Sequence, residues 1–320
     1  MNIIRFVKDW TLPIAMIAGA LSYVVYINIP CLAPTKAFAG SAVAVVQPVL
    51  IFCMLFLTFC KIHPRDLRPC RWHLWLLLIQ ALMFVLPALW LIAFPDTAWR
   101  VIIEGGMICM ICPTATASAV VAGKLGGNGA TLTAYIIAVN MLTAILAPLV
   151  LPMAHPHDGL SFLPAFVTIL RKVFPMLICP LLLAWLVRFT MPGLHAKVLR
   201  CKDLAFYIWS VSLALAIAVT ARSIHHNEDG NLWDEVGLAA VSLACCAFQF
   251  AAGRRIGRHY GEPISAGQAL GQKNTVFIIW LGYTFLDPIT SVAGGFYSVW
   301  HNTVNSYQLY LKRKAQQHEA

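Results

Sequence analysis

The sequence has 320 residues, of which 60% are hydrophobic and only 11% are charged, and its net charge is +10. Soluble domains carry about 25% charged residues, so this composition excludes an ordinary soluble protein and predicts a single integral membrane domain over residues 1–320. The positive charge does not indicate nucleic-acid binding, because most basic residues lie in short loops between apolar runs, where they act as topology signals.

Apolar runs of about 20 residues, the length that crosses a bilayer as a helix, recur along the whole chain. They predict an all-α membrane protein with ten transmembrane helices, followed by a cytoplasmic tail at residues 312–320. The expected spans are residues 11–29, 38–60, 73–94, 98–123, 130–153, 166–190, 204–222, 234–253, 263–285 and 288–311. Residues 161–172 are less apolar, so they either lie along the outer interface or begin the sixth span at a tilt.

The loops between these spans sort by charge. One set holds most of the lysines and arginines, such as those at residues 61–71 and 254–258, while the other set holds most of the acidic residues. Basic loops stay on the cytoplasmic side of a membrane. We therefore expect a multi-pass protein of the inner (plasma) membrane, with both the N- and the C-terminus cytoplasmic.

Ten spans divide into two repeats of five, at residues 10–154 (spans 1–5) and residues 161–311 (spans 6–10). Because each repeat has an odd number of spans, the second repeat is inverted in the membrane relative to the first. Inverted repeats are common in transporters, which bind their substrate near the bilayer midplane where the repeats meet.

The fourth span is apolar up to Pro113 and then polar, with Thr114, Thr116 and Ser118 following. Proline removes a backbone donor and disturbs the preceding turn. In lipid the freed backbone groups need partners, so a break of this kind belongs inside protein or beside a water-filled cavity. An ordinary kinked helix is the alternative interpretation.

The ninth span carries Gly271, Gln272, Lys273, Asn274 and Thr275 near its middle. A charge at that depth costs about 2.5–3.5 kcal/mol on insertion scales. Unless the lysine reaches an interface by snorkelling, it needs a partner or a function. This interruption and the one in the fourth span occupy the fourth helix of each repeat, a pattern that points to a binding site. We expect broken helices 4 and 9 to cross at the midplane.

Several motifs together resemble the bile acid:sodium symporter family. They are Cys-Pro-Thr-Ala-Thr-Ala-Ser at residues 112–118, Gly-Asn at 127–128, Gly-Gln-Lys-Asn at 271–274 and Phe-Tyr-Ser-Val-Trp-His-Asn at 296–302. The resemblance implies a panel domain of helices 1, 2, 6 and 7 that rocks against a core domain of helices 3–5 and 8–10. It also implies an organic-anion substrate: a bile-acid-like molecule, a sulfonate or a small carboxylate.

The sodium ligands that the resemblance implies are mostly missing from this chain. Leu132, Ile136 and Ala269 stand where the family has oxygen-bearing side chains, and Ala119 stands where it has an asparagine. A hard cation needs several oxygen donors, which these residues cannot supply. Of the implied ligands, Ser118 and Gln80 remain.

Lys273 stands where the family has a sodium-binding glutamine. Our hypothesis is that its ammonium replaces a sodium ion and hydrogen bonds to Gln80 and to carbonyl groups freed at the crossing, beside Gln272. A lysine that titrates would couple transport to protons, whereas a permanently charged one would support uniport or exchange. The alternative is a sodium-coupled symporter with a remodelled site.

By the same resemblance, Thr116, Asn274 and His301 face the solute, and we add Thr114 and Ser118 as neighbouring hydroxyl groups. Asn140 in the fifth span is a further candidate, with an interhelical hydrogen bond as the alternative. His301 has a satisfied core histidine as its alternative. The positive ends of the half-helices at the crossing suit a carboxylate or a sulfonate.

Other functional classes fit less well. A membrane enzyme would need a nucleophile or a metal cluster, and a solute sensor without transport would need a signalling domain. We expect no cofactor and no metal, because the histidines near residues 155 and 225 have no third anchored ligand. Glu104 is expected to reach the outer interface, with a place in the lining of an outer vestibule as the alternative. The sequence does not predict the oligomeric state.

Overall fold

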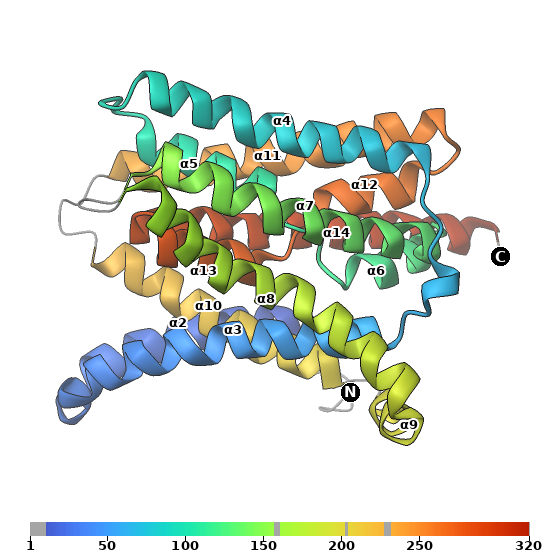
Figure 1. The fold of residues 1–320 in the computed structure, drawn as a ribbon, viewed down its shortest axis with the longest axis horizontal. Helices are drawn as coiled ribbons and strands as arrows, with labels where there is room; N and C mark the ends of the chain where they lie inside the picture. Colours follow the sequence, from blue (N-terminus) through green and yellow to red (C-terminus); the bar gives the residue numbers. More distant parts are fainter. Residues whose placement is uncertain (1–10, 157–160, 202–203, 227–231, 320) are drawn as a thin grey trace. The chain divides into compact units, whose positions relative to one another are not determined.

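The structure, a computed structural model, describes residues 11–156, 161–201, 204–226 and 232–319. These residues form α-helices, 3₁₀-helices and loops, and within them the only β-type pairing is one isolated bridge (Figure 1). The prediction of an all-α protein is therefore confirmed.

The helix bounds are as follows. The α-helices are α2 (Thr11–Asn28), α3 (Lys36–Cys60), α4 (Arg71–Ala93), α5 (Arg100–Ile111), α6 (Ser118–Leu125), α7 (Gly129–Ala154), α8 (Phe162–Thr190), α9 (Pro192–Arg200), α10 (Leu204–His225), α11 (Leu232–His259), α12 (Pro263–Gly271), α13 (Thr275–Phe285) and α14 (Val292–Glu319). The 3₁₀-helices are η1 (Pro30–Thr35), η2 (Pro64–Asp66) and η3 (Pro288–Ser291).

Six of the described helices are long and apolar enough to cross a membrane: α3, α4, α7, α8, α10 and α11. The regions expected as the fourth and ninth spans each hold two short helices instead of one, α5 with α6 and α12 with α13. With 12 residues, α5 is about 18 Å long, which is less than the apolar thickness of a bilayer. The two interruptions predicted from the sequence are therefore present.

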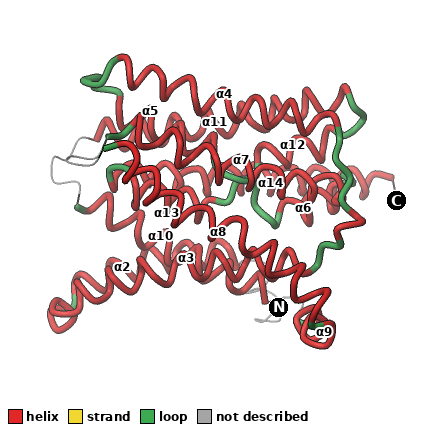
Figure 2. Tube along the Cα trace, in the orientation of Figure 1, coloured by secondary structure: helices red, strands yellow, loops and turns green. Residues whose placement is uncertain are grey.

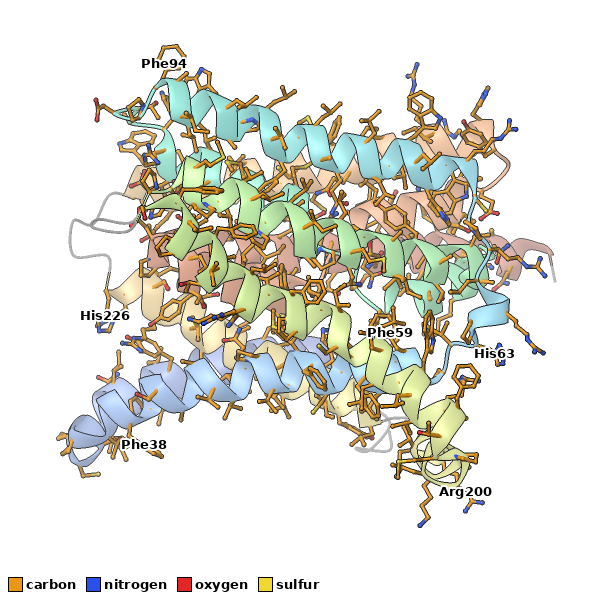
Figure 3. All side chains as sticks on the ribbon, in the orientation of Figure 1. Phe38, Phe59, His63, Phe94, Arg200 and His226 are labelled. Carbon is orange, nitrogen blue, oxygen red and sulfur yellow. The ribbon has the colours of Figure 1, made fainter. Side chains whose placement is uncertain are left out.

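The surface of α4 shows the pattern of a helix that faces lipid. Leu74, Leu78 and Leu86 are exposed on one side, whereas Gln80 is completely buried on the other. Phe94, at the end of the same helix, points away from the other side chains (Figure 3). A soluble protein rarely exposes so much contiguous apolar surface, so this face fits an apolar solvent.

The described helices sort into two compact units. Unit 1 contains α2, α3, α9, α10 and the part of α8 that begins at Pro175. Unit 2 contains α4–α7, the part of α8 that ends at Phe174, and α11–α14. The boundary at residues 174–175 thus lies inside a continuous helix. Every residue of the candidate site described below belongs to unit 2.

Three details differ from, or add to, the sequence prediction. Residues 162–172 are part of the continuous helix α8, so they begin that helix and do not form a separate interfacial segment. The expected tail continues α14 as helix to Glu319, with Lys314 exposed. Helix α9 was not expected; Pro192 at its first position supplies a φ angle suited to starting a helix.

Candidate functional site

Helix α5 ends two residues before Pro113 for a local reason. A proline disfavours the helical conformation in the residue before it, and Cys112 is extended, with φ −53° and ψ 134°. Proline also cannot donate the next helical hydrogen bond. The helix resumes as α6 at Ser118, so residues 112–117 form a non-helical link inside the expected fourth span.

The second interruption separates α12, which ends at Gly271, from α13, which begins at Thr275. A Cβ atom at Gly271 would collide with the ring of Phe250 in α11, so the glycine allows this close approach of two helices. Asn274 caps α13, because its side-chain oxygen accepts a hydrogen bond from the Phe277 amide at 3.3 Å.

The two interruptions pair with each other through their backbones. The amide of Ala115 donates to the carbonyl of Gln272 at 2.9 Å, and the amide of Asn274 donates to the carbonyl of Pro113 at 2.9 Å. Together they form an antiparallel bridge between Thr114 and Lys273. Figure 2 shows these links as green loop segments among the helices of unit 2. The four half-helix ends therefore meet at one buried place.

The last three carbonyl groups of α5, at Cys109, Met110 and Ile111, and the carbonyl of Cys112 directly after it have no helical donors, and buried carbonyls need replacements. Side chains from other parts of unit 2 supply them. The pairs are Gln249 Nε2 to Cys109 (3.3 Å), Lys273 Nζ to Met110 (3.4 Å), Thr143 Oγ1 to Ile111 (2.8 Å), and Gln80 Nε2 to Ile111 (2.9 Å) and Cys112 (3.0 Å). The end of α5 is thus held by one side chain each from α4, α7 and α11 and by the lysine of the second link.

The end of α12 is completed in a similar way. The Thr114 hydroxyl donates to the carbonyl of Ala269, and the Tyr297 hydroxyl of α14 donates to the carbonyl of Gly271 at 2.8 Å. The first link, residues 112–117, therefore supplies a donor to the end of α12, and the second link, residues 272–274, supplies a donor to the end of α5. These bonds hold the two breaks together.

Lys273 is completely buried at the centre of this arrangement. Its ammonium donates to Gln80 Oε1 at 2.9 Å, so the expected hydrogen bond between these two side chains is present. The same oxygen accepts a hydrogen bond from Tyr135 at 3.2 Å. Among the described residues, Lys273 has no acidic partner, and its hydrogen bonds go to neutral groups. The centre of unit 2 thus holds a lysine whose charge, when it is protonated, is not neutralised.

The predicted substrate residues of the fourth span lie at the first interruption. Thr114 is buried, and its hydroxyl is used to hold α12. Thr116 is half-buried in the link. Ser118 is the first residue of α6, is completely buried, and has a hydroxyl without a hydrogen-bond partner among the described residues.

The remaining predicted residues lie in other elements. Gln272 is buried in the second link, and its side-chain oxygen has no partner in the described part of the chain. His301 of α14 is buried with both ring nitrogens unpaired there, and its ring lies 5.7 Å from that of Tyr297. Asn140 donates to the Ile136 carbonyl of its own helix, α7, at 2.7 Å, and no hydrogen bond joins it to the two links.

The sequence reasoning missed Tyr135, Thr143, Gln249 and Tyr297, which support the two breaks. Each is completely buried. In the sequence, Tyr135, Thr143 and Gln249 are polar residues within apolar runs, and that signal could have marked them as partners for freed backbone groups, because polar groups in lipid-facing helices point toward the protein interior. Tyr297 lies in α14, which has many polar residues, so it gives no such signal.

Glu104 also differs from its prediction. It does not reach an interface; it is completely buried, one turn into α5. Its carboxylate pairs with Arg100 at 3.2 Å and with His155 at 2.9 Å. The hydrogen bond that His155 donates to the Glu104 carboxylate raises the pKa of His155, while partial burial opposes that shift.

No protein-family model matches this chain, and a search of the curated proteins finds no match. The resemblance to the bile acid:sodium symporter family therefore stays a prediction from the motifs.

Electrostatically, the crossing is asymmetric. The carboxyl-terminal ends of α5 and α12 carry partial negative charge, and the ammonium of Lys273 lies at the end of α5. The amino-terminal ends of α6 and α13 carry partial positive charge. Asn274 caps α13, but the N-cap residue of α6 is Ala117, whose side chain accepts no hydrogen bond. The start of α6 is thus the end suited to an anionic group.

Proposed function

We propose that this protein is a secondary transporter that carries a small organic anion across the membrane by alternating access. The observation that carries the proposal is the antiparallel pairing of the two helix breaks in the buried centre of unit 2. Broken helices are costly in an apolar environment, because their freed backbone groups must be satisfied again. A protein that only anchors or senses has no need of two such breaks at one place.

The charge at the crossing supports an anionic substrate. Lys273 brings a buried positive charge whose partners are neutral, and the start of α6 adds partial positive charge without a side-chain cap. Ser118, Gln272 and His301 are buried and have polar atoms without partners among the described residues. Buried polar atoms are normally paired, so we assign these three residues, which lie in or beside the two breaks or were predicted to face the solute, to the solute together with Thr116 and Asn274. The anion is a carboxylate or a sulfonate.

Lys273 takes the place of a sodium ion in this proposal. An ammonium offers three donors and one positive charge, and here it contacts one amide oxygen and one backbone carbonyl, the oxygen types that bind a hard cation. Coupling to sodium in the manner of the bile acid:sodium symporter family is then not needed. Proton coupling through Lys273 is the associated hypothesis.

Alternating access needs two bodies that can move. The division of the described helices into two compact units supports this part of the proposal, since the first unit contains α2, α3 and α10 and the second contains both interrupted helix pairs. We propose that these units correspond to a panel and a core domain.

We also propose the complete topology of ten spans in two inverted repeats, in the plasma membrane and with both termini cytoplasmic. In this topology α2 and α14 are spans 1 and 10, and the pairs α5 with α6 and α12 with α13 are spans 4 and 9. The six helices that are long and apolar enough to cross a membrane provide the remaining spans.

Counterflow in proteoliposomes tests the proposal. Vesicles are loaded with one unlabelled organic anion of a panel of carboxylates and sulfonates, and uptake of the same labelled anion is measured in sodium-containing and sodium-free buffer. We expect saturable counterflow of at least one anion that is equal in the two buffers. Binding without counterflow would support a solute sensor instead, and strict sodium dependence would favour a symporter with a remodelled sodium site.

A further inference from the structure

A cluster of metal-ligating side chains lies in unit 2, apart from the crossing. Glu104 comes from the second turn of α5, His155 directly follows α7, and Asp287 lies between α13 and η3. One potential ligand atom from each residue lies within 4.8 Å of those of the other two. Because these residues are far apart in the sequence, only the fold brings them together.

The Glu104 carboxylate points to an additional ligand at this cluster. One of its oxygens accepts from Arg100 at 3.2 Å and contacts His155 Nδ1 at 2.9 Å. The other oxygen is buried and has no hydrogen-bond partner among the described residues. The side chain is only 1% exposed, so water does not reach this oxygen from the surface. A buried carboxylate oxygen without a partner is costly, and a cation would satisfy it.

We infer that Glu104, His155 and Asp287 form a binding site for a divalent transition-metal ion. One imidazole nitrogen and two carboxylate oxygens suit Zn²⁺ and its first-row neighbours, whereas Mg²⁺ and Ca²⁺ prefer oxygen ligands alone. Ligands on a tetrahedral Zn²⁺ lie about 3.4 Å apart, so small side-chain rotations bring the three residues into place. Three protein ligands leave a fourth position for water.

Arg100 helps to position the site without closing it. Its guanidinium also donates to the carbonyl of Ala154 at 2.8 Å and to the carbonyl of Pro95 at 2.8 Å, so it is held mainly by the backbone. It contacts only the Glu104 oxygen that is already paired, which leaves the other oxygen for the ion. A bound ion would therefore tie the start of α5, the end of α7 and the link after α13 together. This inference does not depend on the proposed transport.

The experiment measures Zn²⁺ binding to the purified full-length protein in detergent, after treatment with a chelator and with any affinity tag removed. Titration calorimetry gives the affinity, and the zinc content after gel filtration gives the stoichiometry. We expect one Zn²⁺ per chain, and a loss of affinity of about tenfold or more in each of Glu104→Gln and Asp287→Asn. Asp287 is exposed, so its variant folds even if the Glu104 variant does not.

The control is the double variant His225→Gln, His226→Gln, which replaces two exposed histidines of unit 1. It should bind Zn²⁺ like the unchanged protein. Mg²⁺ at the same concentration should not bind. Three results would each overturn the inference: Zn²⁺ binding that Asp287→Asn leaves unchanged, Zn²⁺ binding that disappears in the control, or Mg²⁺ binding as tight as that of Zn²⁺.

Discussion

Replacing Lys273 by methionine separates a functional role of this lysine from a structural one. Methionine has a similar length but no charge and no donor. The change removes a charge-assisted hydrogen bond to Gln80, worth about 1.5–3 kcal/mol, and a longer one to Met110. It also removes the cost of burying an ammonium that is completely shielded from solvent, which is several kcal/mol. The two effects oppose each other, so we expect the stability to change by no more than about 2 kcal/mol.

Anion binding should respond far more strongly to the same change. A unit charge about 8 Å from an anion, at an effective dielectric constant of about 20, contributes about 2 kcal/mol to binding. Lys273→Met should therefore weaken anion binding about 30-fold, since every 1.4 kcal/mol is a factor of ten. The matched control is Lys124→Met, which removes an exposed lysine from α6 and should change neither quantity appreciably.

Gln80→Leu completes the test, because it should lower the stability strongly, whereas Lys273→Met should change the stability little. It leaves the Lys273 ammonium with the carbonyl of Met110 alone, and it leaves the carbonyl of Cys112 without the donor of Gln80. The expected loss of stability is about 3–6 kcal/mol. In the double variant with Lys273→Met the charge is gone, so the loss should be about 2 kcal/mol smaller than the sum of the single effects.

The assays are the apparent melting temperature in detergent and anion binding, measured for the four variants side by side. A direct role of Lys273 in anion binding would be excluded if Lys273→Met destabilised the protein as much as Gln80→Leu while anion binding stayed intact. Lys273 would then be a structural donor for the end of α5 and would have no direct effect on the substrate.

Three further pairs of substitutions test the structure of unit 2 by thermal unfolding. Asn128→Ala removes the N-cap of α7 and should lower the free energy of unfolding by about 1 kcal/mol. Asn128→Asp keeps a capping oxygen and should lower it little. Equal losses of stability in the two variants would contradict the capping role. Gly253→Ala should cost about 1–3 kcal/mol, because its Cβ would collide with the backbone of α12, whereas Gly123→Ala, which meets open space, should be neutral or stabilising. Thr143→Val removes the donor to the Ile111 carbonyl and should lower the free energy of unfolding by about 1 kcal/mol. Thr143→Ser keeps a hydroxyl donor and should retain the stability.

The sequence was sufficient to locate the two helix breaks, because their causes are local. Pro113 cannot continue a helix, and the run of polar residues at 271–275 is unusual within an apolar segment. The ends of α5 at Ile111 and of α12 at Gly271 lie within two residues of those signals. Local chemistry decides where a helix stops, so one sequence is enough.

The pairing of the breaks could not be derived in the same way. The hydrogen bond from Asn274 to Pro113 joins residues far apart in the chain, and no local signal records that contact. Glu104 illustrates the same limit: a glutamate near a helix end is usually a surface residue, and only the fold brings Arg100 and His155 to it. Of the predictions that depended on tertiary neighbours, the hydrogen bond between Lys273 and Gln80 is confirmed, whereas the one for Glu104 is wrong.

The position of Pro175 has a mechanical meaning for the two units. The chain passes between them after residues 61, 174 and 231, and the second of these points lies inside the continuous helix α8. Because Pro175 has no amide hydrogen, the carbonyl one turn earlier lacks its helical partner, and Pro180 repeats this loss in the same helix. Helix α8 is therefore weakened close to the point where the chain passes from one unit to the other, and bending of this helix is expected there.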